Sequence, residues 1–207
     1  MAGLTGWVGL LERAIGYGLR SVEAVEPAFL YRPTPCAEWN LRDLLLHLND
    51  SISVLQQGVY FGRVGLEPSR DGEAGEYAYG DGEPAAELVA VFRARAQRLL
   101  RTWSETWRED QRIAVDGHLM AAELMAAAAV VEISVHGWDV SAACGDPRPI
   151  PEPLARDALV VSRLVVGGIP RPPLYAPALS VSPAACSSDR LLAFLGRAPD
   201  GVAYDAA

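Results

Sequence analysis

The sequence contains no lysine: all 18 basic residues are arginines, and 26 acidic residues outnumber them to give a net charge of −8. Nucleic-acid-binding surfaces are typically rich in clustered basic residues, which neutralise the phosphate backbone. This acidic chain without lysine is therefore expected to have no nucleic-acid partner.

Cysteine is also scarce. The three cysteines, Cys36, Cys144 and Cys186, are widely spaced and form no C-x-x-C pair. This spacing argues against a disulfide framework and against a structural zinc knot. The first residues also lack the basic region and the small-residue cleavage site of a signal peptide. Together these features predict a cytoplasmic protein.

No apolar run has the length of a membrane span. The longest one, residues 119–135, is interrupted by Glu123 and Glu132, whereas a membrane-spanning helix needs about 20 mostly apolar residues. We therefore expect a buried helix here and no membrane partner. With 207 residues, half of them hydrophobic and 21% charged, the chain is typical of a soluble globular protein with a sizeable core.

Apolar residues recur at helical spacing in four long segments, which predict helices over residues 4–25, 40–60, 84–107 and 119–143. Asn40 is expected to cap the second helix. Residues 61–82, rich in Gly, Asp and Glu, predict a long loop that closes over the site, and residues 113–115 predict a short extended segment.

After Gly145 the sequence turns proline-rich and predicts two shorter helices, at 154–166 and 188–195, with an extended stretch at 170–183 between them. The pattern predicts a mainly all-α fold. Residues 1–145 would form a four-helix bundle, and residues 146–207 a small, irregular, helix-containing C-terminal segment packed on it.

Only three histidines are present, and one of them pairs with an acid on a predicted helix. Glu132 and His136 are four residues apart and therefore project from one helix face. Small apolar residues surround Glu132, so its buried carboxylate needs a partner: an arginine, a histidine cation or a metal ion. His47, on the second helix, is placed to face this pair across the bundle.

Two readings of these three side chains remain open from spacing alone. His47, Glu132 and His136 would leave a fourth position open on a zinc ion, as catalytic zinc sites do. The alternative is a surface ion pair beside a hydrogen-bonded core histidine. His118, near the start of the fourth predicted helix, is the leading alternative ligand.

Two sequence blocks carry a family resemblance. Residues 34–44 read T-P-C-A-E-W-N-L-R-D-L and lead to His47, and residues 132–139 read E-I-S-V-H-G-W-D. They resemble the T-P-C-x-x-W-x-x-x-D-L-x-x-H and E-x-x-x-H-G-W-D blocks of the mycothiol-dependent maleylpyruvate isomerase family, in the DinB-like superfamily. The ending at residues 189–197 is similar to that of a short-form branch of metal-binding proteins.

The resemblance implies a DinB-like bundle in which His47, Glu132 and His136 are the metal ligands and act in catalysis through the metal. Zinc suits these ligands, with nickel or iron as alternatives. Asp139 would orient a ligand from behind, or else be a surface charge at the helix end. Trp39 and Trp138 are expected to pack in the core, and Cys36 to be a buried small residue.

The resemblance further implies a zinc-dependent enzyme that uses mycothiol as its thiol cosubstrate on a small electrophile. It would be an S-transferase or a thiol-assisted cis–trans isomerase, as a monomer or homodimer. Because the segment after Gly145 is shorter than the C-terminal domain of the founding isomerase, we expect this class of chemistry without assigning maleylpyruvate as the substrate. The alternatives are a zinc hydrolase that activates water and a non-catalytic bundle that binds a metal or small molecule.

Overall fold

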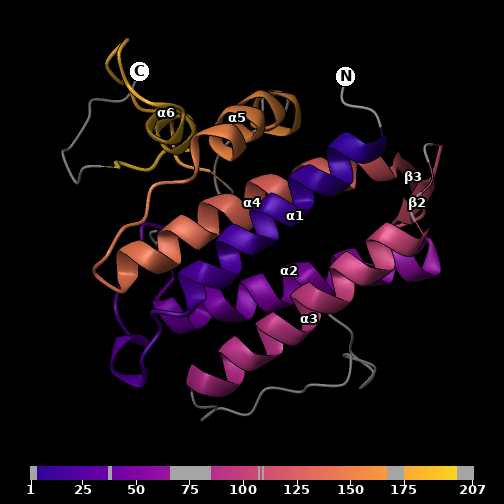
Figure 1. Ribbon diagram of the computed structural model, residues 1–207, viewed down its shortest axis with the longest axis horizontal. Helices are drawn as coiled ribbons and strands as arrows, with labels where there is room; N and C mark the ends of the chain where they lie inside the picture. The colour runs from indigo at the N-terminus through magenta and orange to yellow at the C-terminus, as the bar shows by residue number, and fades with distance from the viewer. Residues whose placement is uncertain are drawn as a thin grey trace.

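The computed structural model in Figure 1 describes residues 4–36, 39–65, 85–106, 108, 110–166 and 175–199, and within them the chain is mainly helical. The mainly all-α fold class predicted from the sequence is confirmed. The helices are α1 (Leu4–Val22), α2 (Leu41–Phe61), α3 (Ala85–Thr106), α4 (Ala122–Ala143), α5 (Glu152–Val166) and α6 (Ser187–Phe194), with a 3-10 turn at Pro27–Phe29.

Helices α1 to α4 pack around a common core. Helix α4 contacts α1 and α2, and α3 contacts the same two helices from the other side. In Figure 1, α4 runs behind α1, while α5 and α6 lie together on one side of this group. The C-terminal helices join the core through α5, which packs on α4, and α6 then packs on α5. The division at residue 145 into two units stays a prediction.

Helix α4 is central because its sequence has no polar stripe. Most of its residues are buried, as expected of a helix that is apolar on nearly every side. Its contact with α1 is close: a Cβ atom on Gly137 would lie 3.0 Å from the Tyr17 ring. Even alanine at position 137 would therefore require the Tyr17 ring to shift by a few tenths of an ångström. No described helix is long and apolar enough to cross a membrane.

A small sheet lies at one end of the helices (Figure 1). Its middle strand contains the short extended segment predicted at residues 113–115, whereas its outer strands lie where the sequence predicted a loop and the start of a helix. Strand β1 (Arg63–Val64) pairs in parallel with β2 (Arg112–Val115), which pairs antiparallel with β3 (His118–Ala121). The prediction of a helix from residue 119 was therefore wrong: α4 begins at Ala122. Asp116 and Gly117 both have positive φ, at 46° and 80°, and form the hairpin turn that Asp-Gly sequences favour.

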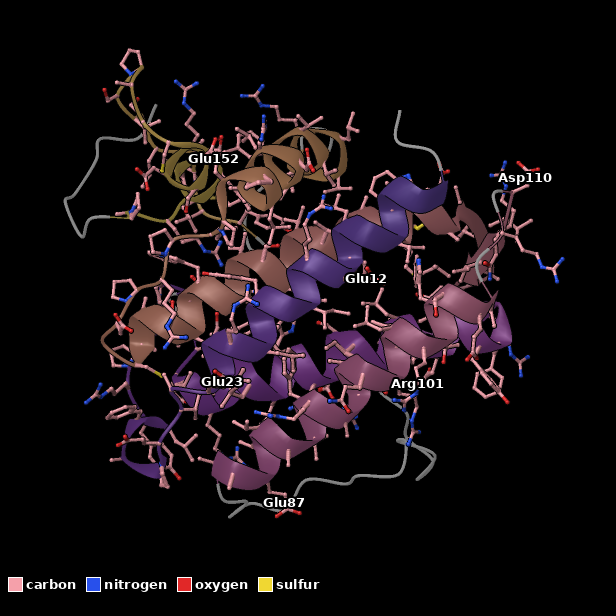
Figure 2. All side chains as sticks on the ribbon, viewed as in Figure 1. Glu12, Glu23, Glu87, Arg101, Asp110 and Glu152 are labelled. Atoms are coloured by element: carbon pink, nitrogen blue, oxygen red, sulfur yellow. The ribbon has the colours of Figure 1, made fainter. Side chains whose placement is uncertain are left out.

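The predicted long loop also begins differently. Phe61 belongs to α2 and residues 63–64 to the sheet, whereas residues 66–82 of the predicted loop lie outside the described part of the chain. The arginines of α3 differ in their exposure to solvent. Arg101 is exposed with Glu87 on the outer face (Figure 2), but Arg95 is buried and donates a hydrogen bond to the Asn49 carbonyl oxygen.

Candidate metal centre

The start of α2 is fixed by its own sequence. The side chain of Asn40 accepts a hydrogen bond from the backbone N–H of Asp43, whose carboxylate accepts one from the backbone N–H of Asn40. This reciprocal capping satisfies two N–H groups that a helix end otherwise leaves without partners. The confirmed cap sets where α2 begins and thereby which face of the helix presents His47.

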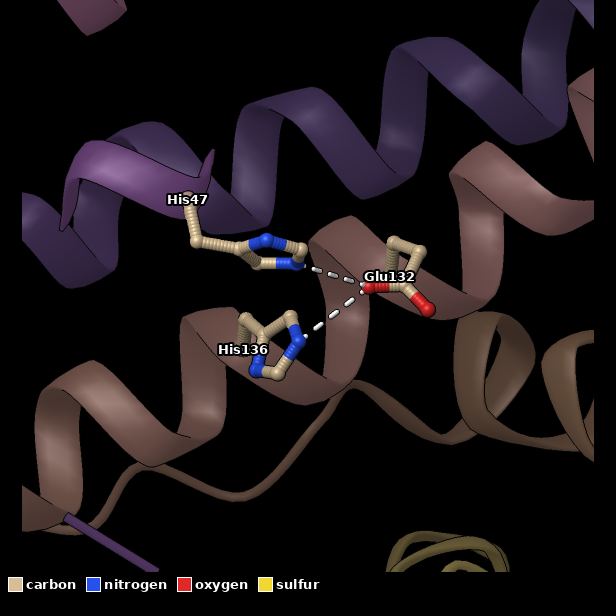
Figure 3. A group of neighbouring side chains, drawn as sticks. All are labelled: His47, Glu132 and His136. Atoms are coloured by element: carbon tan, nitrogen blue, oxygen red, sulfur yellow. Dashed lines mark hydrogen bonds and ion pairs between the residues drawn. The ribbon is translucent and has the colours of Figure 1, made fainter. Parts of the chain in front are cut away.

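Helix α4 supplies the other two side chains. Glu132 and His136 are one turn apart, and both point toward His47 in Figure 3. The Glu132 Oε2 atom lies 3.4 Å from His47 Nε2 and 3.1 Å from His136 Nε2. One ligand atom from each of the three residues lies within 4.8 Å of the others. We refer to His47, Glu132 and His136 as the triad.

The donor atoms of the triad suit a metal ion. Two imidazole nitrogens and one carboxylate oxygen are the usual ligands of zinc, and three protein ligands leave a further position for a substrate. The His136 Nδ1 atom lies 2.9 Å from Asp139 Oδ2. An Nδ1–H donated to this carboxylate leaves the lone pair on Nε2 free to bind a metal, which is the arrangement that metal-bound histidines usually show.

Asp139 is not a surface charge. Its side chain is fully buried and is held by Arg197, whose Nη2 atom donates to Asp139 Oδ2 at 3.0 Å. A buried carboxylate requires such a partner because the loss of hydration is otherwise costly. Arg197 comes from the chain that follows α6, so the C-terminal segment reaches the centre of the molecule directly behind His136.

The electrostatics of the triad and Asp139 follow from these contacts. Burial alone would raise the pKa of Glu132, but hydrogen bonds to His136 and His47 hold it well below its usual range. Burial would lower the pKa of His136, but the hydrogen bonds to Asp139 and Glu132 raise it to about 9. Burial would raise the pKa of Asp139, and the charge of Arg197 lowers it instead. Without a metal, His136 is therefore protonated at neutral pH.

The other residues that the sequence analysis singled out differ in their burial and in their distance from the triad. Trp138 is buried in the core as expected. Trp39 is partly buried, packs against the core and also lies against His47, with ring centroids 4.4 Å apart. Cys36 is half-buried rather than buried. His118 is exposed in strand β3 and does not join the triad.

Sequence reasoning missed two residues of the site. Tyr175 donates a hydrogen bond to Glu132 Oε1 at 2.9 Å, and Arg197 holds Asp139. The similarity of residues 189–197 to a family ending was a signal for Arg197, because it marked the segment that carries this residue. The pattern around Tyr175 gave no comparable signal.

Comparisons with known proteins show the family and the fold of the chain. Residues 11–141 match the family described as the mycothiol maleylpyruvate isomerase N-terminal domain, and the matched range includes the triad and Asp139. The chain is also similar to a crystal structure of a mutant of the mycothiol-dependent maleylpyruvate isomerase. That match has a TM-score of 0.58 and 16% sequence identity, and it covers 75% of this chain and 68% of that one. No curated protein matches.

Proposed function

This chain belongs to the mycothiol maleylpyruvate isomerase N-terminal domain family, and from that premise we propose that it is a metal-dependent enzyme that uses mycothiol as a thiol cosubstrate. The observation that carries the proposal is the convergence of two histidine nitrogens and one glutamate oxygen, with Asp139 fixing His136 from behind. Zinc is the metal we favour, with nickel or iron as alternatives, because histidine and carboxylate ligands with an open position suit it.

His47 and His136 would hold the ion through Nε2, and Glu132 through Oε2. Zinc bound there would supply the positive charge that keeps a neighbouring thiol in its reactive thiolate form at neutral pH. Asp139 keeps His136 in the tautomer that ligation requires. The side chains of His47 and Glu132 are 34% and 28% exposed, against 9% for His136. Substrates would therefore approach the site from the side of His47 and Glu132.

The reaction class follows from the thiolate nucleophile. A mycothiol thiolate adds to one carbon of an electrophilic double bond, which forms a C–S bond and places the electron pair on the rest of the conjugated substrate. Rotation about the resulting single bond, followed by expulsion of the thiolate, gives cis–trans isomerisation. Capture of a proton instead retains the C–S bond and gives S-transfer. We propose this thiol chemistry on a small electrophile, in the cytoplasm, where the three free cysteines fit a reducing environment.

Metal analysis of the purified protein beside Glu132→Ala, followed by calorimetric titration with mycothiol, tests the proposal. We expect about one zinc ion per chain in the wild type, as for other single sites with three protein ligands, loss of the metal in the variant, and thiol binding only to the metal-loaded protein. Glu123→Ala is the matched control, because Glu123 lies on the same helix but outside the triad.

The other outcomes identify the competing functions. Metal without mycothiol binding would contradict thiol chemistry and favour a hydrolase that activates water. Metal and thiol binding without turnover of any electrophile would favour a binding protein. A wild-type protein that takes up no metal would contradict the proposed centre itself.

A further inference from the structure

Tyr175 makes the two oxygens of Glu132 unequal. Its hydroxyl group donates to Oε1 at 2.9 Å, while Oε2 faces His47 Nε2 at 3.4 Å and His136 Nε2 at 3.1 Å. The tyrosine and the two histidines thus contact different oxygens of the same carboxylate. Tyr175 reaches it from the C-terminal segment, 43 residues further along the chain and beyond the residues that the family match covers.

Glu132 depends on contacts of this kind for its orientation. Its neighbours one turn earlier on α4 are Ala128 and Ala129, whose methyl groups cannot form hydrogen bonds with the carboxylate. A glutamate side chain has several rotatable bonds, and its terminal torsion is broad, so it needs partners to hold one orientation. The histidines are partners for Oε2, and the phenol of Tyr175 is the partner that the structure shows for Oε1.

We infer that Tyr175 is a positioning residue that restricts Glu132 to metal binding through Oε2 alone. A carboxylate binds a metal ion through one oxygen or through both, and a hydroxyl group on Oε1 competes with the second metal–oxygen bond. A second carboxylate oxygen on the ion would occupy a position that the thiol needs. Tyr175 thus protects the open position of a site with three protein ligands. The inference rests on the proposed metal centre.

The test compares Tyr175→Phe with the wild type, because this change removes the hydroxyl group and keeps the ring. Zinc affinity is measured by competition with a chromophoric chelator. The lost hydrogen bond weakens the ligand, whereas a second carboxylate oxygen on the ion adds a bond, so we expect zinc affinity to change by less than the about 10- to 100-fold that is usual for losing a hydrogen-bond partner of a metal ligand. In the cobalt-substituted proteins we expect the visible absorption band of the variant to be weaker, as the carboxylate gains a second bond and the coordination number rises.

Two controls separate positioning from folding. Tyr60→Phe, at a tyrosine that is 72% exposed, is the matched control and should leave both the zinc affinity and the cobalt spectrum unchanged. Thermal unfolding of metal-free Tyr175→Phe should resemble that of the metal-free wild type, because phenylalanine keeps the packing of the ring. A role of Tyr175 limited to packing would leave the cobalt spectrum unchanged.

A cobalt spectrum that is unchanged in Tyr175→Phe, whatever its zinc affinity, would overturn the restriction to one oxygen and with it the inference, provided that the wild type binds metal. If the wild type and Tyr175→Phe both fail to bind zinc or cobalt, the proposed metal centre fails first, so the two failures are distinguishable.

Discussion

His136 and His47 face the same oxygen of Glu132 from two helices, but their surroundings differ. The side chain of His136 is 9% exposed, and its second nitrogen contacts Asp139, which Arg197 holds in turn. The side chain of His47 is 34% exposed, lies against the Trp39 ring, and has Ser51 Oγ 3.5 Å from Nε2. His136 is thus preorganised by the buried ion pair of Asp139 and Arg197, whereas His47 borders solvent.

This difference shows which side of the site holds its side chains in a fixed orientation and which side is open to solvent. A metal ligand whose second nitrogen is held by a carboxylate stays in the orientation that binding requires. A partly exposed ligand leaves room for a substrate to approach. Under the proposed function, the His136 side would therefore set the affinity for the metal, and the His47 side would admit the thiol and the electrophile.

The largest expected effects come from removing either histidine. His47→Ala and His136→Ala should both lose the metal, but only His136→Ala should clearly lower the stability of the metal-free protein, by about 2 kcal/mol through a buried cavity and a lost hydrogen bond. Metal content and chemical denaturation measure the two effects. His118→Ala, at an exposed histidine, serves as the control. Equal losses of stability in the two variants would remove the distinction between the two sides.

The next effect is pH dependence, which arises on the His136 side. Because its pKa is raised from 6.5 to about 9, protonated His136 stabilises the metal-free fold. That contribution is complete below pH 6.5 and is lost as the pH rises to about 9. It amounts to at most about 3 kcal/mol. Zinc must displace the same proton, so its affinity should rise about tenfold per pH unit below the pKa.

Denaturation of the metal-free protein and zinc competition, both between pH 6.5 and 8.5, measure these two trends of opposite sign. His136→Gln removes the titrating group, so the stability of the metal-free variant should depend less on pH over this range. A wild-type stability that does not fall relative to this variant as the pH rises would contradict the assigned role of His136.

The smallest effects come from the residues behind each histidine. Asp139→Asn should weaken zinc binding about 10- to 100-fold because it removes the charged partner of His136. It also leaves Arg197 buried beside a neutral amide. Ser51→Ala should change zinc affinity less than about threefold, since its hydroxyl makes only a long contact to His47. Chelator competition measures the zinc affinity of both variants relative to that of the wild type. Similar losses in the two would show that the ligands are held equally.

Local sequence patterns predicted some features of the site and missed others. The capping residues of α2 and the four-residue spacing of Glu132 and His136 are local features, and the sequence predicted both. The spacing did not reveal that Asp139 is fully buried, because a charged residue near a helix end is usually solvated. The first strand of the hairpin before α4 was predicted as an extended segment, but its turn and second strand were missed even though Asp116-Gly117 is a recognised turn signal. The apolar residues around it suit a helix or a strand equally well.

The sequence by itself determined the mainly helical fold class, the start of α2 and the candidate triad, because helix periodicity, capping and i, i+4 spacing act over a few residues. Only the tertiary structure decided that Tyr175 holds Glu132 and that Arg197 holds Asp139, across 43 and 58 residues. No local period encodes such contacts. They arise because the C-terminal segment packs against α4 through α5, and buried carboxylates must find partners among the side chains that this packing brings near.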